Sequence, residues 1–137
     1  MECLQNVILE KLNSDNLKKY FIKLGVSTAL VFGSVLTDEF NEESDVDIAI
    51  LSSSKLNIKA ILNLELYLED LLDRPIDVVD LNSEKLDVFI KIEILNNNKL
   101  IYSQDNSVSL NKLIDNTEWY YRENEHYFEC RKRDLLC

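Results

Sequence analysis

The stretch Val31–Leu51 reads VFGSVLTDEFNEESDVDIAIL and holds two features that decide the fold. One is the pair Gly33 and Ser34, which directly follows a short apolar run. The other is the pair Asp45 and Asp47, separated by one residue, which opens a second apolar run. The pattern predicts two strands joined by a loop, with the Gly-Ser turn at the end of the first strand and the acidic pair at the start of the second.

The spacing of the two aspartates places them on one face of the second strand. Side chains alternate along a strand, so Asp45 and Asp47 point away from Val46, Ile48 and Ile50. The two Cβ atoms are then about 7 Å apart, and carboxylates at that separation repel each other unless a cation lies between them. Magnesium is commonly held by one or two carboxylates together with substrate phosphates. An isolated pair of this kind also occurs on the solvated side of an edge strand, so the pair alone does not decide between the two interpretations.

The upstream Gly-Ser pair favours the ligand-binding interpretation. Gly33 ends its strand without a side chain, so a phosphate can approach the backbone closely there. Ser34 adds a hydroxyl group and a backbone N–H that can donate to the same phosphate. Together with the two aspartates, this pair predicts a site for a metal-bound phosphate compound.

The remaining sequence predicts alternating helices and strands. A helix with an apolar stripe is expected to end at Gly25, because glycine suits a left-handed C-terminal cap. A later helix stops before Pro75, because proline disfavours helical geometry in the residue that precedes it. The expected order is helix, helix, strand, strand, helix, strand, helix, strand, helix, with strands at residues 28–32, 46–51, 76–81 and 99–102 and one long C-terminal helix at about 107–135.

Composition limits both the architecture and the function. A chain of 137 residues with 46% hydrophobic content is expected to form a single domain over residues 1–137. A formal net charge of −10 argues against binding long nucleic acid through its phosphates, because that needs a basic surface. Nucleic acid is therefore not expected as a direct ligand. The N-terminus has no long apolar run, so neither a signal peptide nor a membrane span is expected, and the cytoplasm is the expected location.

The pattern G-S-x10-D-x-D, formed by Gly33, Ser34, Asp45 and Asp47, resembles the signature of the DNA polymerase β-like nucleotidyltransferases. The small size of the chain is similar to that of the minimal nucleotidyltransferase (MNT) antitoxins, which are encoded beside HEPN-domain toxins. The resemblance implies an α/β fold of the α+β type, in which helices flank a small mixed sheet and the core spans residues 26–103.

The resembled family completes its metal site with a third aspartate, in an apolar-Asp-apolar-apolar run that Asp77 matches within Ile76–Val79. Asp80 lies on the same expected strand. Alternation places Asp77 and Asp80 on opposite faces, so only one of them can face Asp47. We favour Asp77 because it fits the family run, and we expect Asp80 to cap the helix that follows near Ser83.

The resemblance implies a nucleotidyltransferase site. The three aspartates would bind two Mg²⁺ ions and act in catalysis (Asp45, Asp47 and Asp77), and the Gly-Ser pair would bind ATP. Asp77 would also take the proton of the acceptor hydroxyl. In the resembled antitoxins the acceptor is a tyrosine hydroxyl of the partner HEPN ribonuclease toxin. The implied activity is therefore protein adenylylation (AMPylation), which neutralises the toxin.

Two alternatives stay open at this point. An antitoxin that only binds and masks its toxin would carry the same fold with an idle metal site. Transfer to a small molecule such as an aminoglycoside, or to tRNA, would use the same chemistry on another acceptor. The chain has no room for a second, drug-binding domain after Ser103, and the charge of −10 disfavours tRNA.

Overall fold

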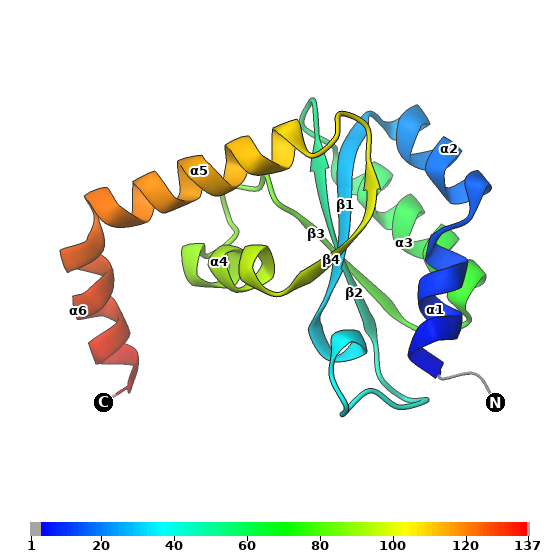
Figure 1. The fold of residues 1–137 in the computed structure, drawn as a ribbon, viewed down its shortest axis with the longest axis horizontal. Helices are drawn as coiled ribbons and strands as arrows, with labels where there is room; N and C mark the ends of the chain where they lie inside the picture. Colours follow the sequence, from blue (N-terminus) through cyan, green and yellow to red (C-terminus); the bar gives the residue numbers. More distant parts are fainter. Residues whose placement is uncertain (1–3, 137) are drawn as a thin grey trace.

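The computed structural model describes residues 4–136, and it describes side chains as far as Arg131. Within that range, no helix is both long enough and apolar enough to cross a membrane. The described residues form the elements labelled in Figure 1, in the order α1 (Leu4–Leu12), α2 (Asp15–Leu24), β1 (Val26–Phe32), the 3-10 helix η1 (Gly33–Leu36), β2 (Val46–Ser52), α3 (Ile58–Leu72), β3 (Ile76–Asp80), α4 (Val88–Asn96), β4 (Asn98–Ser103), α5 (Val108–Glu123) and α6 (Glu125–Leu136).

The four strands form one mixed sheet in the order β3-β2-β1-β4. Strand β1 runs antiparallel to both β2 and β4, whereas β2 and β3 run parallel. The β2–β3 connection is the helix α3, as a parallel crossover requires. The predicted α+β class with a small mixed sheet is confirmed, and the strand expected near residues 99–102 is an edge strand.

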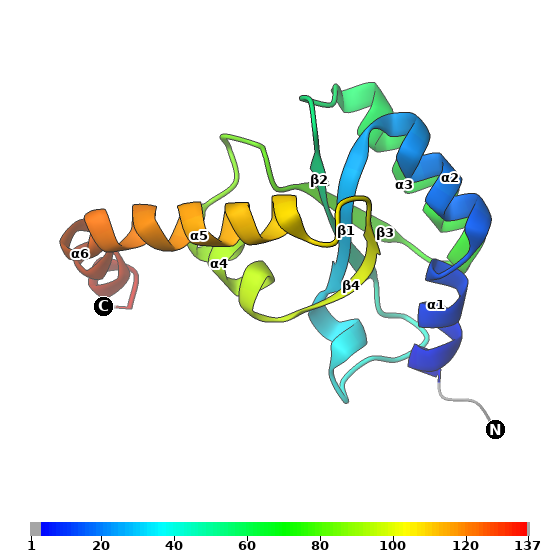
Figure 2. The same cartoon turned by 45° about the horizontal axis from the view of Figure 1, so that its top comes forward.

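Helices cover both faces of the sheet (Figures 1 and 2). One face is packed beneath α1, α2 and α3, and its buried residues include Phe21, Ile48, Leu64 and Leu68. The other face is packed beneath α4 and α5, and its buried residues include Leu30, Ala49, Leu51, Leu81 and Ile94. Alternation along β2 divides its side chains between these two cores, as the sequence predicts.

The helix ends follow the local capping rules. The Ser14 hydroxyl oxygen accepts a hydrogen bond from the N–H of Leu17 (3.3 Å) at the start of α2. Gly25 ends the same helix with φ of 79°, in the left-handed region that glycine tolerates. Helix α3 ends at Leu72, before Pro75. The ends at Gly25 and before Pro75 match the predicted boundaries, because each depends on a few neighbouring residues.

The predicted single C-terminal helix is wrong, because two helices, α5 and α6, meet at Asn124. The backbone of Asn124 leaves helical geometry (φ −118°, ψ 21°), and its side-chain amide donates to the carbonyl of Tyr120 (2.9 Å). The chain then turns so that Phe128 is buried against α4 and α5. Figure 1 shows α6 directed across the line of α5 at the end farthest from the sheet.

Candidate functional site

Two aspartates lie side by side at the N-terminal end of the parallel strand pair β2–β3. Asp47 of β2 is paired with Asp77 of β3 in the register of the sheet. Along the same face follow Ala49 and Leu51 of β2 and, just after β3, Leu81, which belong to the core beneath α4 and α5. The strand alternation predicted for Asp77 is therefore observed, and the long-range pairing brings it next to Asp47.

Asp80 lies on the opposite face of β3. It is paired with Ile50, which belongs to the core beneath α1, α2 and α3. Its Oδ1 accepts a hydrogen bond from the N–H of Asn82 (2.9 Å) and so closes a turn. The predicted helix cap is wrong, because α4 begins only at Val88 and Asp87 caps it. The sequence alone did not indicate how many residues separate β3 from the next helix.

Negative charge accumulates around Asp47. The pKa of Asp47 is raised above the usual aspartate range, first because burial disfavours its charged form, and then because Asp77 and Asp45 repel it. Asp47 is half-buried, whereas Asp45 is exposed and lies just before β2. A cluster in which carboxylates raise the pKa of a neighbour favours a cationic ligand, because a cation removes the repulsion.

Gly33 is required by two features of the site. Its φ of +81° lies in the left-handed region, where a side chain is strained. A Cβ added at this position would also overlap the Oδ2 atom of Asp47. The close approach follows from the pairing of β1 with β2, which places Phe32 opposite Asp47. The Gly-Ser turn therefore lies directly against the carboxylate of Asp47.

Ser34 continues the turn within η1. Its carbonyl oxygen accepts hydrogen bonds from both the N–H and the hydroxyl of Thr37, each at 2.9 Å. The side chain of Ser34 is half-buried. The turn holds the backbone of Ser34. Ser34 follows directly, in sequence, the residue that contacts the Asp47 carboxylate.

A cavity of about 520 Å³ opens beside this turn. It lies between the end of β1, the 3-10 helix η1 and the junction of α4 with β4. Its lining includes Gly33, Leu36, Glu93 and the asparagine run Asn96–Asn98. Its volume is in the range of small-molecule sites. The sequence did not predict that the junction of α4 with β4 lines a cavity beside the Gly-Ser turn. The run of three asparagines between a helix and a strand was the local signal for it.

The carboxylate set was tested for its fit to a metal ion. Among the side chains that the structure describes, residues 4–131, no group of three His, Cys, Asp or Glu residues is arranged closely enough to hold a metal. The donor chemistry nevertheless suits magnesium, because Asp47 and Asp77 are paired carboxylates whose repulsion a hard cation would relieve. Magnesium characteristically takes few protein carboxylates and completes its coordination with water and phosphate oxygens.

Comparisons with known sequences agree with this geometry. Residues 15–107 match the family model described as polymerase beta, nucleotidyltransferase. A protein from Methanocaldococcus jannaschii that is named as a protein adenylyltransferase is 34% identical over 76 residues, which are 56% of this chain and 74% of the relative. A second protein of that organism, with the same type of name, is 33% identical over 75 residues and is covered to 78% of its length.

Solved structures share the fold at lower identity. A chain in the crystal structure of a toxin–antitoxin with AMP-PNP has a TM-score of 0.63 at 22% identity, covering 88% of this chain and 98% of that one. A chain in the structure of a tri-AMPylated HEPN toxin in complex with MNT antitoxin, from Shewanella oneidensis, has a TM-score of 0.62 at 19% identity, covering 97% and 99%. These likenesses show that the chain adopts the fold found in those complexes.

Proposed function

The chain belongs to the polymerase β nucleotidyltransferase family, and on that premise we propose that it transfers AMP from ATP to a tyrosine hydroxyl of a HEPN-domain toxin and thereby acts as its antitoxin. The observation that carries the proposal is the placement of Asp47 beside Asp77, with Gly33 against the Asp47 carboxylate. Support for the protein acceptor comes from the names of the relatives and from the MNT–HEPN complexes that share the fold.

Each of the proposed site residues has its own role in the transfer. Asp45, Asp47 and Asp77 would hold two Mg²⁺ ions, which when bound neutralise the triphosphate charge and lower the pKa of the attacking hydroxyl. The backbone at Gly33 and Ser34 would hold the triphosphate, because the absent side chain allows close approach.

Asp77 serves as the proton acceptor in this scheme. The tyrosine oxygen attacks the α-phosphorus in line, and its proton passes to the Asp77 carboxylate. The bond between the α-phosphorus and the bridging oxygen breaks, and pyrophosphate leaves with that oxygen. The products are O-adenylyl-tyrosine and pyrophosphate, and Asp77 returns its proton to solvent.

We assign the acceptor hydroxyl to a partner protein because the relatives are named as protein adenylyltransferases. We propose that the nucleotidyltransferase domain spans residues 1–137, with a core at residues 26–103 that includes the Gly-Ser turn and the three aspartates. The net charge of −10 disfavours RNA as the acceptor. We assign the pair to the cytoplasm, where both ATP and the RNA substrate of the toxin are found.

Intact-mass measurement of the toxin tests the proposal. A HEPN-domain protein chosen as the candidate toxin is incubated with the chain, ATP and MgCl₂, and we expect its mass to increase by whole AMP units. Asp47→Asn should abolish the increase, and Asp80→Asn is the matched control, because Asp80 makes the same type of carboxylate on the opposite face of the sheet. The asparagine at position 80 can still accept the hydrogen bond from Asn82.

Other outcomes would overturn the proposal. If the Asp47→Asn protein neutralises the toxin and no mass change occurs with the unmodified chain, the chain is a binding-only antitoxin. If labelled AMP appears on tRNA or on a small molecule instead, the acceptor is wrong. Thermal unfolding should show that Asp47→Asn remains folded, because the substitution removes a carboxylate whose pKa is raised by burial and by the neighbouring carboxylates.

A further inference from the structure

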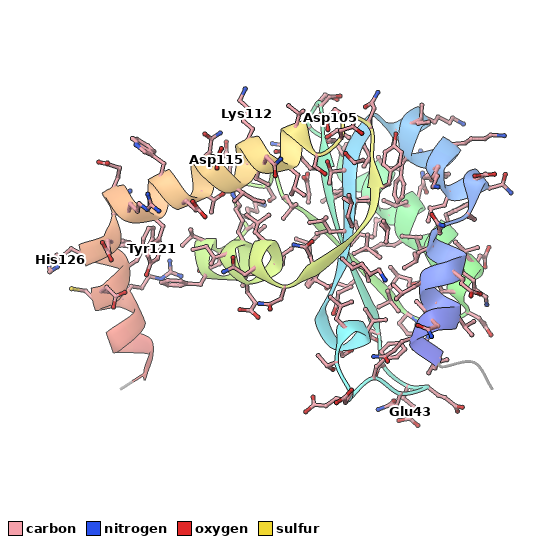
Figure 3. All side chains as sticks on the ribbon, in the orientation of Figure 1. Glu43, Asp105, Lys112, Asp115, Tyr121 and His126 are labelled. Carbon is pink, nitrogen blue, oxygen red and sulfur yellow. The ribbon has the colours of Figure 1, made fainter. Side chains whose placement is uncertain are left out.

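The loop between the Gly-Ser turn and the acidic pair has a defined internal structure. The N–H of Ser44 donates to the carbonyl of Asn41 (3.2 Å), and the N–H of Asn41 donates to the Ser44 hydroxyl (3.1 Å). The N–H of Glu43 donates to the Asn41 side chain (2.8 Å). These bonds close residues 41–44 into a turn directly before Asp45. Figure 3 shows Glu43 on this loop, at the bottom of the view.

A single arginine side chain is hydrogen-bonded to both ends of this turn. Arg74 follows α3, and its Nη1 donates to the carbonyls of Asn41 (3.2 Å) and Ser44 (2.9 Å). Its guanidinium group also lies over the ring of Phe40, at 4.7 Å from the centroid. Each acceptor is a backbone carbonyl of an otherwise exposed loop. Arg74 therefore connects both ends of this turn to the segment between α3 and β3.

The residues on both sides of Asp45 are tied to the same dipeptide. The carbonyl of Ser44 is bonded to Arg74, and the N–H of Val46 donates to the carbonyl of Pro75 (3.1 Å). Arg74 and Pro75 lead directly into β3, the strand that carries Asp77. The Asp45 side chain itself is exposed. Its place relative to Asp77 is therefore set through its two neighbours.

We propose that Arg74 is a positioning residue, which holds Asp45 where its carboxylate can join Asp47 and Asp77 in binding a divalent cation. This inference rests on the proposed function, since it gives that cation site its third carboxylate. The same Nη1 atom reaches both carbonyls while the planar guanidinium group lies over the Phe40 ring, and a lysine ammonium group lacks that plane. The loop is long and acidic, and without the clamp Asp45 would move with it.

Hydrogen exchange of the loop is the first test. In Arg74→Met, amides of residues 41–46 should exchange at least about tenfold faster, because a turn released from its clamp opens more often. Arg74→Lys keeps the charge and N–H donors but loses the planar group that lies over Phe40, so it should give an intermediate rate. The control is Arg122→Met on α5, which removes an exposed arginine distant in sequence and should leave the loop unchanged. If the amides of residues 41–46 exchange at the same rate in Arg74→Met, Arg74 does not hold the loop.

Binding of Mn²⁺, followed by its electron paramagnetic resonance signal, is the second test. Residues that orient metal ligands typically change affinity 10–100-fold, so Arg74→Met should weaken Mn²⁺ binding by about tenfold. In an Asp45→Asn background the same change should add nothing, because Arg74 acts through Asp45. If Arg74→Met lowers the Tm but leaves Mn²⁺ affinity intact, Arg74 only stabilises the fold and the inference is wrong.

Neither measurement requires a toxin as acceptor. The proposed function and the positioning role of Arg74 can therefore be disproved independently. If the unmodified chain transfers no AMP but Arg74→Met still weakens Mn²⁺ binding through Asp45, the proposed function is wrong and the positioning role stands. If transfer occurs and Arg74→Met changes neither the exchange rate nor the Mn²⁺ affinity, the function stands and the positioning role is wrong. Should Arg74→Met not fold, Arg74→Lys carries the same comparison with a smaller expected change.

Discussion

The acidic end of the sheet and the C-terminal arm, formed by α5 and α6, are held in place by different kinds of interaction. Backbone pairing sets the first, because the register of β2 with β3 places Asp47 beside Asp77. Side-chain packing sets the second, because α6 is held to α4 and α5 chiefly by one buried ring, Phe128, and by the ion pair of Arg131 with Asp87. Figure 3 shows Tyr121 turned inward and His126 pointing outward on this arm.

The difference determines what a substitution can change. A side chain on a paired strand can be replaced while the ladder keeps its neighbours in register, so function changes and the fold persists. A buried side chain that packs a helix against its neighbours determines where that helix lies. Its loss therefore changes the structure locally. Substitutions in the two regions should therefore separate activity from stability.

Loss of Asp77 should have the largest effect. Asp77→Ala is expected to reduce AMP transfer by at least about a thousandfold, because in the proposed mechanism Asp77 is both a metal ligand and the proton acceptor. Asp80→Ala should keep most activity and cost about 1 kcal/mol, since it removes one turn hydrogen bond to Asn82. Rates of transfer and urea unfolding check both variants. The reverse ranking would mean that the active face of β3 is the other one.

Loss of Phe128 should have the next largest effect, and only on the arm. The ring is 2% exposed and contacts the rings of Phe89, Tyr120, Tyr121 and Tyr127. Phe128→Ala should weaken the docking of α6 by about 3 kcal/mol, as loss of a buried aromatic ring does. Hydrogen exchange should then rise in α6 while β1 and β2 keep their protection and Mn²⁺ affinity is unchanged.

Tyr127→Ala is the matched control for the buried ring. Tyr127 neighbours Phe128 in sequence but is 63% exposed, so its removal should cost well under 1 kcal/mol. If both variants release α6 equally, the arm is held by the aromatic surface as a whole. If Phe128→Ala weakens Mn²⁺ binding, the C-terminal arm and the acidic end of the sheet are coupled, and substitutions in them do not separate activity from stability.

Gly33 offers a smaller, two-part test. Gly33→Ala should cost about 1 kcal/mol of stability from its left-handed backbone and, in addition, displace the Asp47 carboxylate. Gly25→Ala has a similar φ of +79°, but the nearest atom to its new Cβ is the Ser53 hydroxyl oxygen at 3.6 Å. Both should lower the Tm, and only Gly33→Ala should weaken Mn²⁺ binding. Equal Mn²⁺ affinities would show that Asp47 rotates away without consequence.

The ion pair on the arm should give the smallest effect. The hydrogen bond from Arg131 lowers the pKa of Asp87, helped by the N–H of Phe89. A lowered folded-state pKa gives stability that is present above the unfolded value of about 3.9 and is lost as the pH falls through the folded value. Arg131→Met should therefore cost less than about 1 kcal/mol at pH 7, because the pair is partly exposed. Tm measured against pH should show the difference from the unmodified protein vanish in acid.

The local features of the fold could be predicted from the sequence. Gly25 and Ser14 mark the ends of α2, the alternation along β2 separates Asp47 from Ile48, and the same alternation separates Asp77 from Asp80. Each depends on a few adjacent residues, because strand alternation and helix capping are short-range effects. The family pattern added the expected roles of the aspartates.

Which distant residues meet depends on how the elements pack in three dimensions. The register that pairs Asp47 with Asp77, the contact of Gly33 with Asp47 and the hold of Arg74 on the loop before Asp45 each join separate segments. The break at Asn124 has the same origin, because the uninterrupted helical pattern gives way where Phe128 can be buried against α4. Such contacts depend on how whole elements pack, and no local periodicity encodes that packing.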